Sequence, residues 1–351
     1  MMLRRQLLQL LFWSAAASPL AALAQTTYSI TLAPDLRNAT GIDNKGRIAG
    51  ALLFRPFEFH AALWTGNRLL DAGASFQGES QALGVSDNGA VVGSVLPQAA
   101  SPFGFLYWRG KATNVGKFIS PYAVNKQLQV VGQKSTGNNT WRAVLWQEGK
   151  LRDLGTLGGS VSGAYGINNQ GTVVGFSYLT DEPNVTIHGF VYRDGKMKDI
   201  GTLPGGTFSS AEVINDAGLV AGVANAGGRA ETHAFIYVHG VMRDIGSFGG
   251  YTTVEGINNR GHIVGTGEDA LRVSRGYIYR DGRLVDLNTL IARSSGWRVT
   301  QAYDINDKGQ IAVLLEKTGG EGGSFGRLDP VHDANCDEDH AAGDAEGGAR
   351  Q

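Results

Sequence analysis

The 351-residue chain contains a single cysteine, Cys336, and no cluster of lysine or arginine residues. One cysteine cannot form an intramolecular disulfide, so the fold has to rely on its hydrophobic core. The formal net charge of −1 and the lack of a basic patch give no electrostatic basis for binding nucleic acid or an anionic membrane. No GxSxG, HExxH, P-loop or dinucleotide-binding motif occurs in the structural context that it requires. We therefore expect neither a nucleic-acid partner nor a cofactor.

A long apolar run lies at the N-terminus. Arg4 and Arg5 precede it, and it ends in Ala22-Leu23-Ala24, which is typical of a secretory signal peptide with an A-x-A cleavage site. Serine and proline residues interrupt the run, and it is short for a membrane-spanning helix. We expect residues 1–24 to be removed and the mature protein to be secreted, in the periplasm or outside the cell, with no membrane span. The paired arginines leave Sec and twin-arginine export both open.

Glycine is abundant, with 51 residues, and a repeat accounts for much of it. In the copy at residues 142–175, the β-prone runs AVLW and LRDL flank QEGK, and YGI and TVVG flank NNQG. Asparagine and glycine tolerate positive φ, so Asn-Asn-x-Gly is a good tight turn between two strands. The glycine-rich segment GTLGGS separates the two hairpins. Each copy therefore predicts four short antiparallel strands.

The glycine that closes the TVVG-type strand marks the period of the repeat. It recurs at Gly50, Gly93, Gly132, Gly175, Gly222 and Gly265, and Val313 takes the seventh place. Intervals of 39 to 48 residues with four strands each are typical of propeller blades. We predict an all-β fold: a seven-bladed β-propeller of four-stranded antiparallel blades that spans residues 25–330 as one domain.

The two ends of the repeat region are complementary. Residues 27–32 form an outer strand with no preceding partner, and residues 324–330 lack a following outer strand. We expect Tyr28–Leu32 to pair with about Phe325–Leu328 and close the ring, which removes unpaired sheet edges. In the third copy Leu128 replaces the turn glycine, and there we expect a different turn.

Residues 331–351 are acidic, rich in small residues and nearly free of large apolar groups. Such a segment cannot bury enough surface to order itself, so we expect a disordered tail. His332, Cys336 and His340 stand among its carboxylates. Their spacing matches no known zinc motif, and we predict no metal site there.

The recurring segments resemble a known family. His188–Gly206 (HGFVYRDGKMKDIGTLPGG) and His233–Gly250 are each followed by segments such as Gly256–Gly265 (GINNRGHIVG). They are similar to the HAF-type extracellular repeat of bacteria, and the resemblance covers nearly all of residues 28–330. It implies a secreted protein, and it implies no particular activity.

The connections within the repeat divide into two classes. The NNxG and xxG turns are short and uniform, whereas the connections between the two central strands differ in every copy. In a four-stranded antiparallel blade these two classes lie on opposite faces of the propeller, and functional groups often lie on loops held by a rigid scaffold. We expect the variable-loop face to bind a glycan or a protein; the alternative is that its loops only face solvent. The candidate residues are Arg55, Phe57, Trp141, Tyr178, Asp181, Glu182, Arg229, Glu268 and Asp269.

The mouth of the central channel is the second candidate. Just before the recurring isoleucine, the innermost strands carry Tyr122, Tyr165, Glu212, Glu255 and Tyr303. Glu212 and Glu255 occupy matching places in neighbouring blades, where two close carboxylates could act as acid and base or hold a cation. No nucleophile accompanies them, so the simpler interpretation is that each faces channel water.

Three other sets of recurring residues have structural interpretations. We expect the recurrent aspartates to accept hydrogen bonds from backbone N–H groups rather than to bind calcium. The strand-initial histidines are too few for a metal-binding ring, and the large aromatic residues should pack between blades. These sets are Asp71, Asp153, Asp199, Asp244 and Asp286; His60, His188 and His233; and Trp64, Trp108, Trp146, Tyr192, Tyr237 and Tyr279.

Together these observations predict a secreted, monomeric β-propeller that acts as a binding or scaffold module for a glycan or an extracellular protein. A carbohydrate-active enzyme, a lyase or hydrolase that uses the channel carboxylates, is the alternative. A purely structural role in the cell envelope is a third class that the sequence leaves open.

Overall fold

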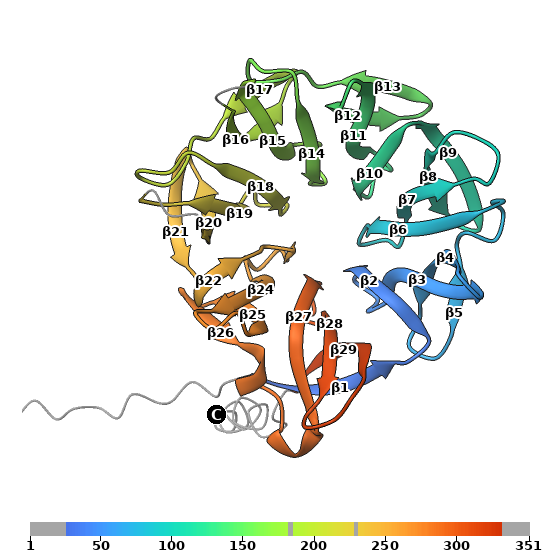
Figure 1. Cartoon of the computed structure of the whole chain (residues 1–351), viewed down its shortest axis with the longest axis vertical. Coiled ribbons are helices and arrows are strands. Elements are labelled where there is room, and N and C mark those ends of the chain that lie inside the picture. Colours follow the sequence, from blue (N-terminus) through green and yellow to red (C-terminus); the bar gives the residue numbers. More distant parts are fainter. Residues whose placement is uncertain (1–25, 182–184, 228–230, 332–351) are drawn as a thin grey trace, which may run out of the picture.

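The computed structural model describes residues 26–181, 185–227 and 231–331. These residues form seven antiparallel sheets around a central axis (Figure 1), so the predicted seven-bladed β-propeller is confirmed. Within these ranges the only helical segments are the short 3-10 helices η1 (Leu287–Thr289) and η2 (Arg293–Ser295), and none is long and apolar enough to cross a membrane. The predicted signal peptide and residues 332–351 of the predicted tail, Cys336 among them, lie outside the described residues. Val331, predicted as the first residue of the tail, instead ends the last strand.

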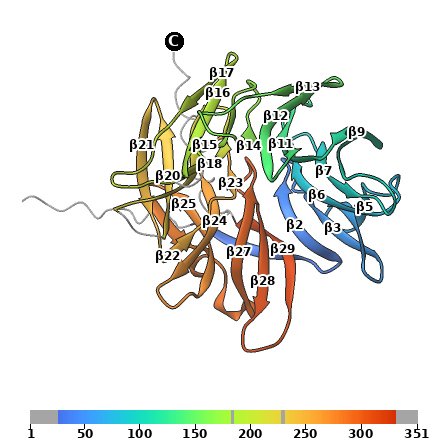
Figure 2. The same ribbon diagram turned by 45° about the horizontal axis from the view of Figure 1, so that its top comes forward.

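Each blade runs outwards from an inner strand next to the central axis. Figure 2, an oblique view, shows the inner strands around this axis. Blades 1 to 3 are β2 (Leu36–Ile42), β3 (Ile48–Arg55), β4 (Glu58–Trp64) and β5 (Leu69–Asp71); β6 (Glu79–Val85), β7 (Val91–Leu96), β8 (Phe103–Trp108) and β9 (Lys111–Lys117); and β10 (Ile119–Val124), β11 (Val130–Gly137), β12 (Thr140–Gln147) and β13 (Lys150–Asp153). Blades 4 and 5 are β14 (Ser162–Ile167), β15 (Val173–Thr180), β16 (Thr186–Arg193) and β17 (Lys196–Asp199); and β18 (Ser209–Ile214), β19 (Val220–Asn225), β20 (Thr232–Val238) and β21 (Val241–Gly246).

The last two blades depart from this pattern. In blade 6 the inner position is shared by β22 (Gly249–Thr252) and β23 (Gly256–Ile257), which both pair with β24 (Ile263–Asp269); β25 (Ser274–Arg280) and β26 (Arg283–Asp286) follow. Blade 7 consists of β27 (Trp297–Ile305), β28 (Ile311–Lys317), β29 (Gly323–Val331) and, as its outer strand, β1 (Thr27–Ala33).

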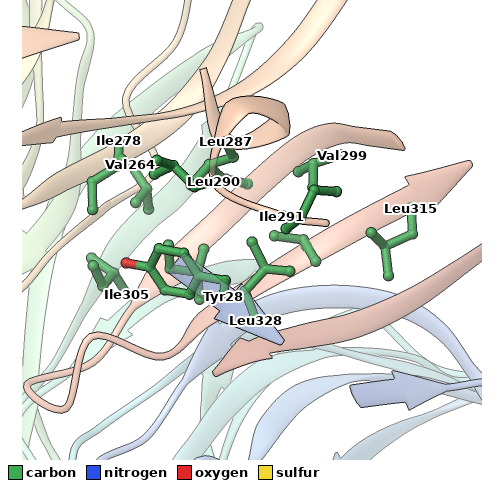
Figure 3. Close-up of a cluster of buried hydrophobic side chains, with 13 residues drawn as sticks. Tyr28, Val264, Ile278, Leu287, Leu290, Ile291, Val299, Ile305, Leu315 and Leu328 are labelled. Carbon is green, nitrogen blue, oxygen red and sulfur yellow. The ribbon is translucent and has the colours of Figure 1, made fainter. Parts of the chain in front are cut away.

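Strand β1 closes the ring. It pairs antiparallel with β29, from Thr27 opposite Val331 to Ala33 opposite Phe325, which confirms the predicted pairing and extends it slightly. Tyr28 is only 6% exposed and lies in the hydrophobic cluster between blades 6 and 7 (Figure 3), and its backbone N–H donates to the carbonyl of Leu290 at 2.8 Å. The N-terminal strand therefore belongs to the core of the last blade.

The recurring glycine has a steric cause. A Cβ at Gly175 would lie 2.0 Å from the carbonyl oxygen of Gly163 on the inner strand, and the five equivalent glycines meet the same clash at 1.9 to 2.1 Å. A side chain there would displace the inner strand. The seventh place carries Val313, and the structure gives no reason for the side chain there: β27 has a register shift between Val299 and Gln301, but β2 has the equivalent shift between Leu36 and Asn38, opposite a retained glycine.

The prediction of a different turn at Leu128 is wrong. Leu128 adopts φ 60°, and its N–H donates to the carbonyl of Asn125 at 3.0 Å, as the N–H of Gly171 does to Asn168 at 3.1 Å. The Asn125 side chain fixes this turn by accepting from the N–H groups of Gln127 and Gln129. A left-handed conformation costs a non-glycine residue about 1–2 kcal/mol, and the partial burial of Leu128 against its hydrophobic cluster offsets part of that cost.

The aromatic residues expected between blades pack there, Trp108 included, although Trp108 stands one residue beyond the shared position. Trp64, Tyr192 and Tyr237 are buried in the hydrophobic clusters. In blade 2 the strand register assigns this position to Tyr107, opposite Val91, and not to Trp108. Two aromatic residues, Tyr107 and Trp108, stand side by side there, so the sequence alone does not distinguish which one takes the shared position.

The recurrent aspartates accept backbone hydrogen bonds as predicted. Asp199 accepts from the N–H of Gly201, and the equivalent bonds in the other four copies are also 2.7 to 2.9 Å long. In three blades the same carboxylate lies 2.8 or 2.9 Å from the Nδ1 atom of a histidine on the neighbouring strand, namely His60, His188 or His233. Each of these histidines therefore has a partner within its own blade.

Candidate central channel site

The inner strands enclose a central channel with a cavity of about 460 Å³. All five residues predicted at the channel mouth line it: Tyr122, Tyr165, Glu212, Glu255 and Tyr303. The rings of Tyr122 and Tyr165 meet edge to face, with centroids 5.3 Å apart. The fold thus brings together side chains from five blades that lie far apart in the sequence.

A β-bulge places these side chains at the axis. The ladder between β14 and β15 pairs Ala164 with Gly175 and then Gly166 with Val174, which leaves Tyr165 as the extra residue. The same shift isolates Tyr122 in β10, Glu212 in β18 and Tyr303 in β27. Bulges commonly redirect a side chain in this way. The bulged residue, two positions before the recurring isoleucine, therefore faces the channel and not a neighbouring blade.

The two glutamates titrate abnormally. Burial, together with the negative charge of Glu255, raises the pKa of Glu212 to about 7. Glu255 is open to channel water, yet protein surrounds much of its side chain, and this desolvation raises the pKa of its carboxyl as well. Within the described part of the chain, no lysine, arginine or histidine forms an ion pair with either glutamate.

The tyrosines of the channel stay protonated. Burial raises the pKa of Tyr303 to about 12, and the charge of Glu255 adds to the shift. Burial, with a contribution from Glu212, raises the pKa of Tyr165 still further. Both hydroxyls therefore keep their proton at any physiological pH, and the Tyr303 hydroxyl donates it to Oε1 of Gln301.

Sequence reasoning missed Asp304, a third carboxylate in the channel wall. Its side chain lies across the seam between blades 7 and 1, where it accepts the N–H groups of Ile42 and of its own neighbour Ile305, each at 2.8 Å. Burial raises the pKa of Asp304 to about 7. The signal was present: the other six copies have glycine, alanine or valine at this place.

The turn-side mouth of the channel carries a further ring that the sequence analysis did not select. It comes from the second residue of each NNxG-type turn and includes Asp87, Lys126, Asp216 and Asp307. Lys126 forms an ion pair with Asp87 at 2.9 Å, and Asp216 accepts the backbone N–H of Asn169 in the preceding blade at 2.9 Å. The sequence does contain a signal for this ring, because Asn or Asp recurs directly after the buried first residue of the turn.

The described candidates on the variable-loop face belong to four different blades. Phe57, 91% exposed, occupies the tip of the β3–β4 hairpin in blade 1, and Trp141, 37% exposed, lies on β12 in blade 3. Tyr178 belongs to blade 4 and Glu268 to blade 6. None of the candidates within the described residues lines the channel cavity. Loop length and exposure selected them, and neither property predicts proximity.

Several of these candidates already have local partners. Asp181 accepts from the N–H and hydroxyl of Ser160, and Asp269 accepts from the N–H groups of Leu271 and Val273. Glu268 pairs with Arg272 at 3.1 Å and Arg55 with Glu58 at 3.7 Å. These contacts shape the loops themselves. Glu182 and Arg229 lie outside the described residues.

Comparison with known proteins supports the fold. Neither the family models nor the curated proteins contain a match. Among solved structures, the β-propeller domain of the Trilobed protease from Pyrococcus furiosus, described as having an open velcro topology, matches with a TM-score of 0.58 at 11% identity, over 88% of this chain and 99% of that one. An acylaminoacyl peptidase and a puromycin-hydrolysing peptidase of Mycobacterium tuberculosis each match with a TM-score of 0.56 at 11% identity; the matches span 88% and 84% of this chain and 53% of each peptidase. At this identity the likeness establishes the β-propeller class.

Proposed function

We propose that this chain is a secreted β-propeller of the HAF-repeat type that acts as a binding module for a glycan or a protein partner, with the ligand held in the central channel. The convergence of the five channel residues in one cavity of about 460 Å³ carries this proposal. That volume lies within the usual range of small-molecule sites. The loop-face candidates among the described residues, in contrast, are spread over four blades.

The chemistry of the cavity suits a polar ligand with some apolar surface. The carboxylates of Glu212 and Glu255 accept hydrogen bonds from ligand hydroxyl or amino groups. The rings of Tyr122, Tyr165 and Tyr303 offer apolar surface, and the Tyr165 hydroxyl offers a further donor. Because the seven inner strands belong to separate rigid blades, binding requires little rearrangement of the wall.

A glycan array followed by isothermal titration calorimetry tests the proposal. We expect saturable binding of a glycan, with an affinity that falls about tenfold or more in Tyr165→Ala. An aromatic ring that stacks on a ligand contributes on the order of 1–2 kcal/mol. Phe57→Ala and Trp141→Ala are the matched controls on the loop face. Loss of binding in either of these, with Tyr165→Ala unaffected, would move the site to the loops. If the protein binds no glycan on the array and captures no protein partner, the proposed binding role is refuted.

The glutamate pair favours a second candidate, a carbohydrate-active lyase or hydrolase. Glu212, with its pKa raised to about 7, could act as a general acid, and the neighbouring Glu255 as a base. Incubation with a panel of acidic and neutral polysaccharides, assayed for new reducing ends and for unsaturated products, tests this. Turnover that Glu212→Gln abolishes would establish catalysis; binding without product from any bound glycan would exclude it.

A further inference from the structure

The channel has a strongly one-sided charge. The residues that line its cavity include the carboxylates Asp87, Glu212, Asp216, Glu255, Asp304 and Asp307. The only lysine or arginine among them is Lys126, at the turn-side mouth, where it pairs with Asp87. The middle of the channel therefore has carboxylates from three blades and no protein cation next to them. A narrow passage with walls of low dielectric constant concentrates such a field.

These middle carboxylates are also costly to ionise. Burial disfavours the charge on Glu212, Glu255 and Asp304, and the charge of Glu255 adds to the penalty at the other two. Every charged neighbour that shifts the pKa of Glu212 or Asp304 is itself acidic. A cation that enters the cavity would remove this repulsion, because an opposite charge within a few ångströms favours the ionised carboxylate.

The geometry points to an organic cation and not to a metal ion. Within the described ranges, no three side chains of His, Cys, Asp or Glu are placed to hold a metal. The cavity is also far larger than a bare ion requires. Three tyrosines line it beside the glutamates, and aromatic rings attract ammonium groups while also packing against the apolar faces of sugar rings.

We propose that the central channel binds the protonated amino groups of a glycan that carries free amines, with Glu212 and Glu255 accepting the ammonium hydrogen bonds and Tyr122, Tyr165 and Tyr303 contacting the sugar rings. This inference rests on the proposed function, because it takes the channel to be the ligand site, and it specifies the class of glycan.

A matched pair of ligands tests it. A chitosan oligosaccharide and the fully N-acetylated oligosaccharide of equal length have the same backbone and differ in charge. By calorimetry with the full chain, we expect the chitosan oligosaccharide to bind at least tenfold more tightly, since a hydrogen bond to a charged group contributes roughly one order of magnitude in affinity or more. Spermidine and a short lysine peptide serve as amine probes without a sugar.

Two variants with opposite expected effects on affinity distinguish the effect of the channel charge from a general loss of structure. Glu212→Gln removes a middle carboxylate and should weaken chitosan binding about tenfold, whereas Lys126→Gln removes the only lining cation and should strengthen it several-fold. Asp194→Asn is the control, because it makes the same change in net charge as Glu212→Gln at a turn where the Asp194 side chain is 90% exposed. Unchanged thermal unfolding of each variant shows that its fold is intact.

The outcomes distinguish the two proposals. Equal binding of both oligosaccharides, lost in Tyr165→Ala and unchanged in Glu212→Gln, would overturn the amine inference and keep the channel as a glycan site. Binding of spermidine or the lysine peptide, with no binding of the chitosan oligosaccharide, would overturn the choice of a glycan. Failure of every probe to bind would overturn this inference; the glycan array then decides whether the channel is a ligand site at all.

Discussion

Asn168 of blade 4 donates its side-chain amide to the backbone carbonyl of Asn215 in blade 5, at 3.1 Å. The bond recurs from blade to blade: Asn125 to Asn168, Asn215 to Asn258, Asn258 to Asn306, and Asn306 to Asp43, with distances of 2.8 to 3.1 Å. All of these residues are at most 5% exposed. In blade 1, Asp43 has no amide to donate; Arg47 pairs with it and reaches the carbonyl of Asn88 in blade 2.

The first prediction concerns this ring of amides. Asn168→Asp keeps the oxygen that accepts from the N–H groups of Gln170 and Thr172 but removes the donor to Asn215. Because the Asn215 carbonyl and the new carboxylate are both buried, we expect a loss of about 1–3 kcal/mol in the free energy of unfolding by urea. Asn67→Asp, at an exposed turn, is the control. Equal stability of the two variants would show that the inter-blade bond contributes nothing.

The second prediction concerns the recurring glycine. Gly175→Ala would place a methyl group 2.0 Å from the carbonyl oxygen of Gly163, a backbone atom that cannot rotate away. We expect a loss of about 1–3 kcal/mol or more, typical of overpacking, and a lower Tm. Gly320→Ala, whose new methyl group would meet only Cβ of Lys317 at 3.6 Å, should leave the Tm nearly unchanged. A similar Tm for both variants would contradict the steric explanation of the repeat.

The third prediction concerns ring closure. Tyr28→Ala removes a buried side chain from the hydrophobic cluster that also contains Ile291, Val299 and Leu328. Loss of a buried large aromatic side chain costs about 3–5 kcal/mol, so the variant should unfold at a much lower urea concentration. Deletion of residues 25–32 should have a larger effect, because it also leaves the edge of β29 unpaired. A truncated chain with an unchanged Tm would show that the ring does not need β1.

The fold could be predicted because each blade repeats the same local signals. The Asn-x-x-Gly turns, the closing glycine and the strand-length runs fix four strands per copy, and the unmatched runs at the two ends fix the closing pair. The Leu128 turn could not be predicted, since a side-chain hydrogen-bond set from Asn125 outweighs the preference of leucine for negative φ.

The site divides in the same way. The channel residues were found because the bulge recurs at one place in the repeat, so a shared sequence position became a shared position in space. Asp304 does not belong to a recurring polar position, because its equivalents in the other six copies are glycine, alanine or valine; only the structure shows its contact across the seam with Ile42. Proximity among loop residues depends on how unrelated segments bend, and the repeat carries no information about that.

The last prediction concerns pH. Asp304 has its pKa raised by burial to about 7 in the folded protein, whereas an unfolded chain leaves aspartate near its ordinary value of about 4. The folded state therefore holds the proton more tightly. The stability that this difference contributes is fully present below pH about 4, declines as the pH rises, and is lost above about 7. Relative to Asp304→Asn, which does not titrate, wild-type stability should fall over this window by on the order of 1–4 kcal/mol.

Urea unfolding of wild type and Asp304→Asn at several pH values across that window measures the effect. The difference between the two curves isolates Asp304 from the other titrating groups, including Glu212, whose raised pKa acts in the same direction in both proteins. Asp35→Asn, at an exposed turn, controls for the change in net charge. Parallel curves for wild type and Asp304→Asn would mean that Asp304 ionises normally, and the seam between blades 7 and 1 would then hold a charged carboxylate stabilised by the N–H groups of Ile42 and Ile305.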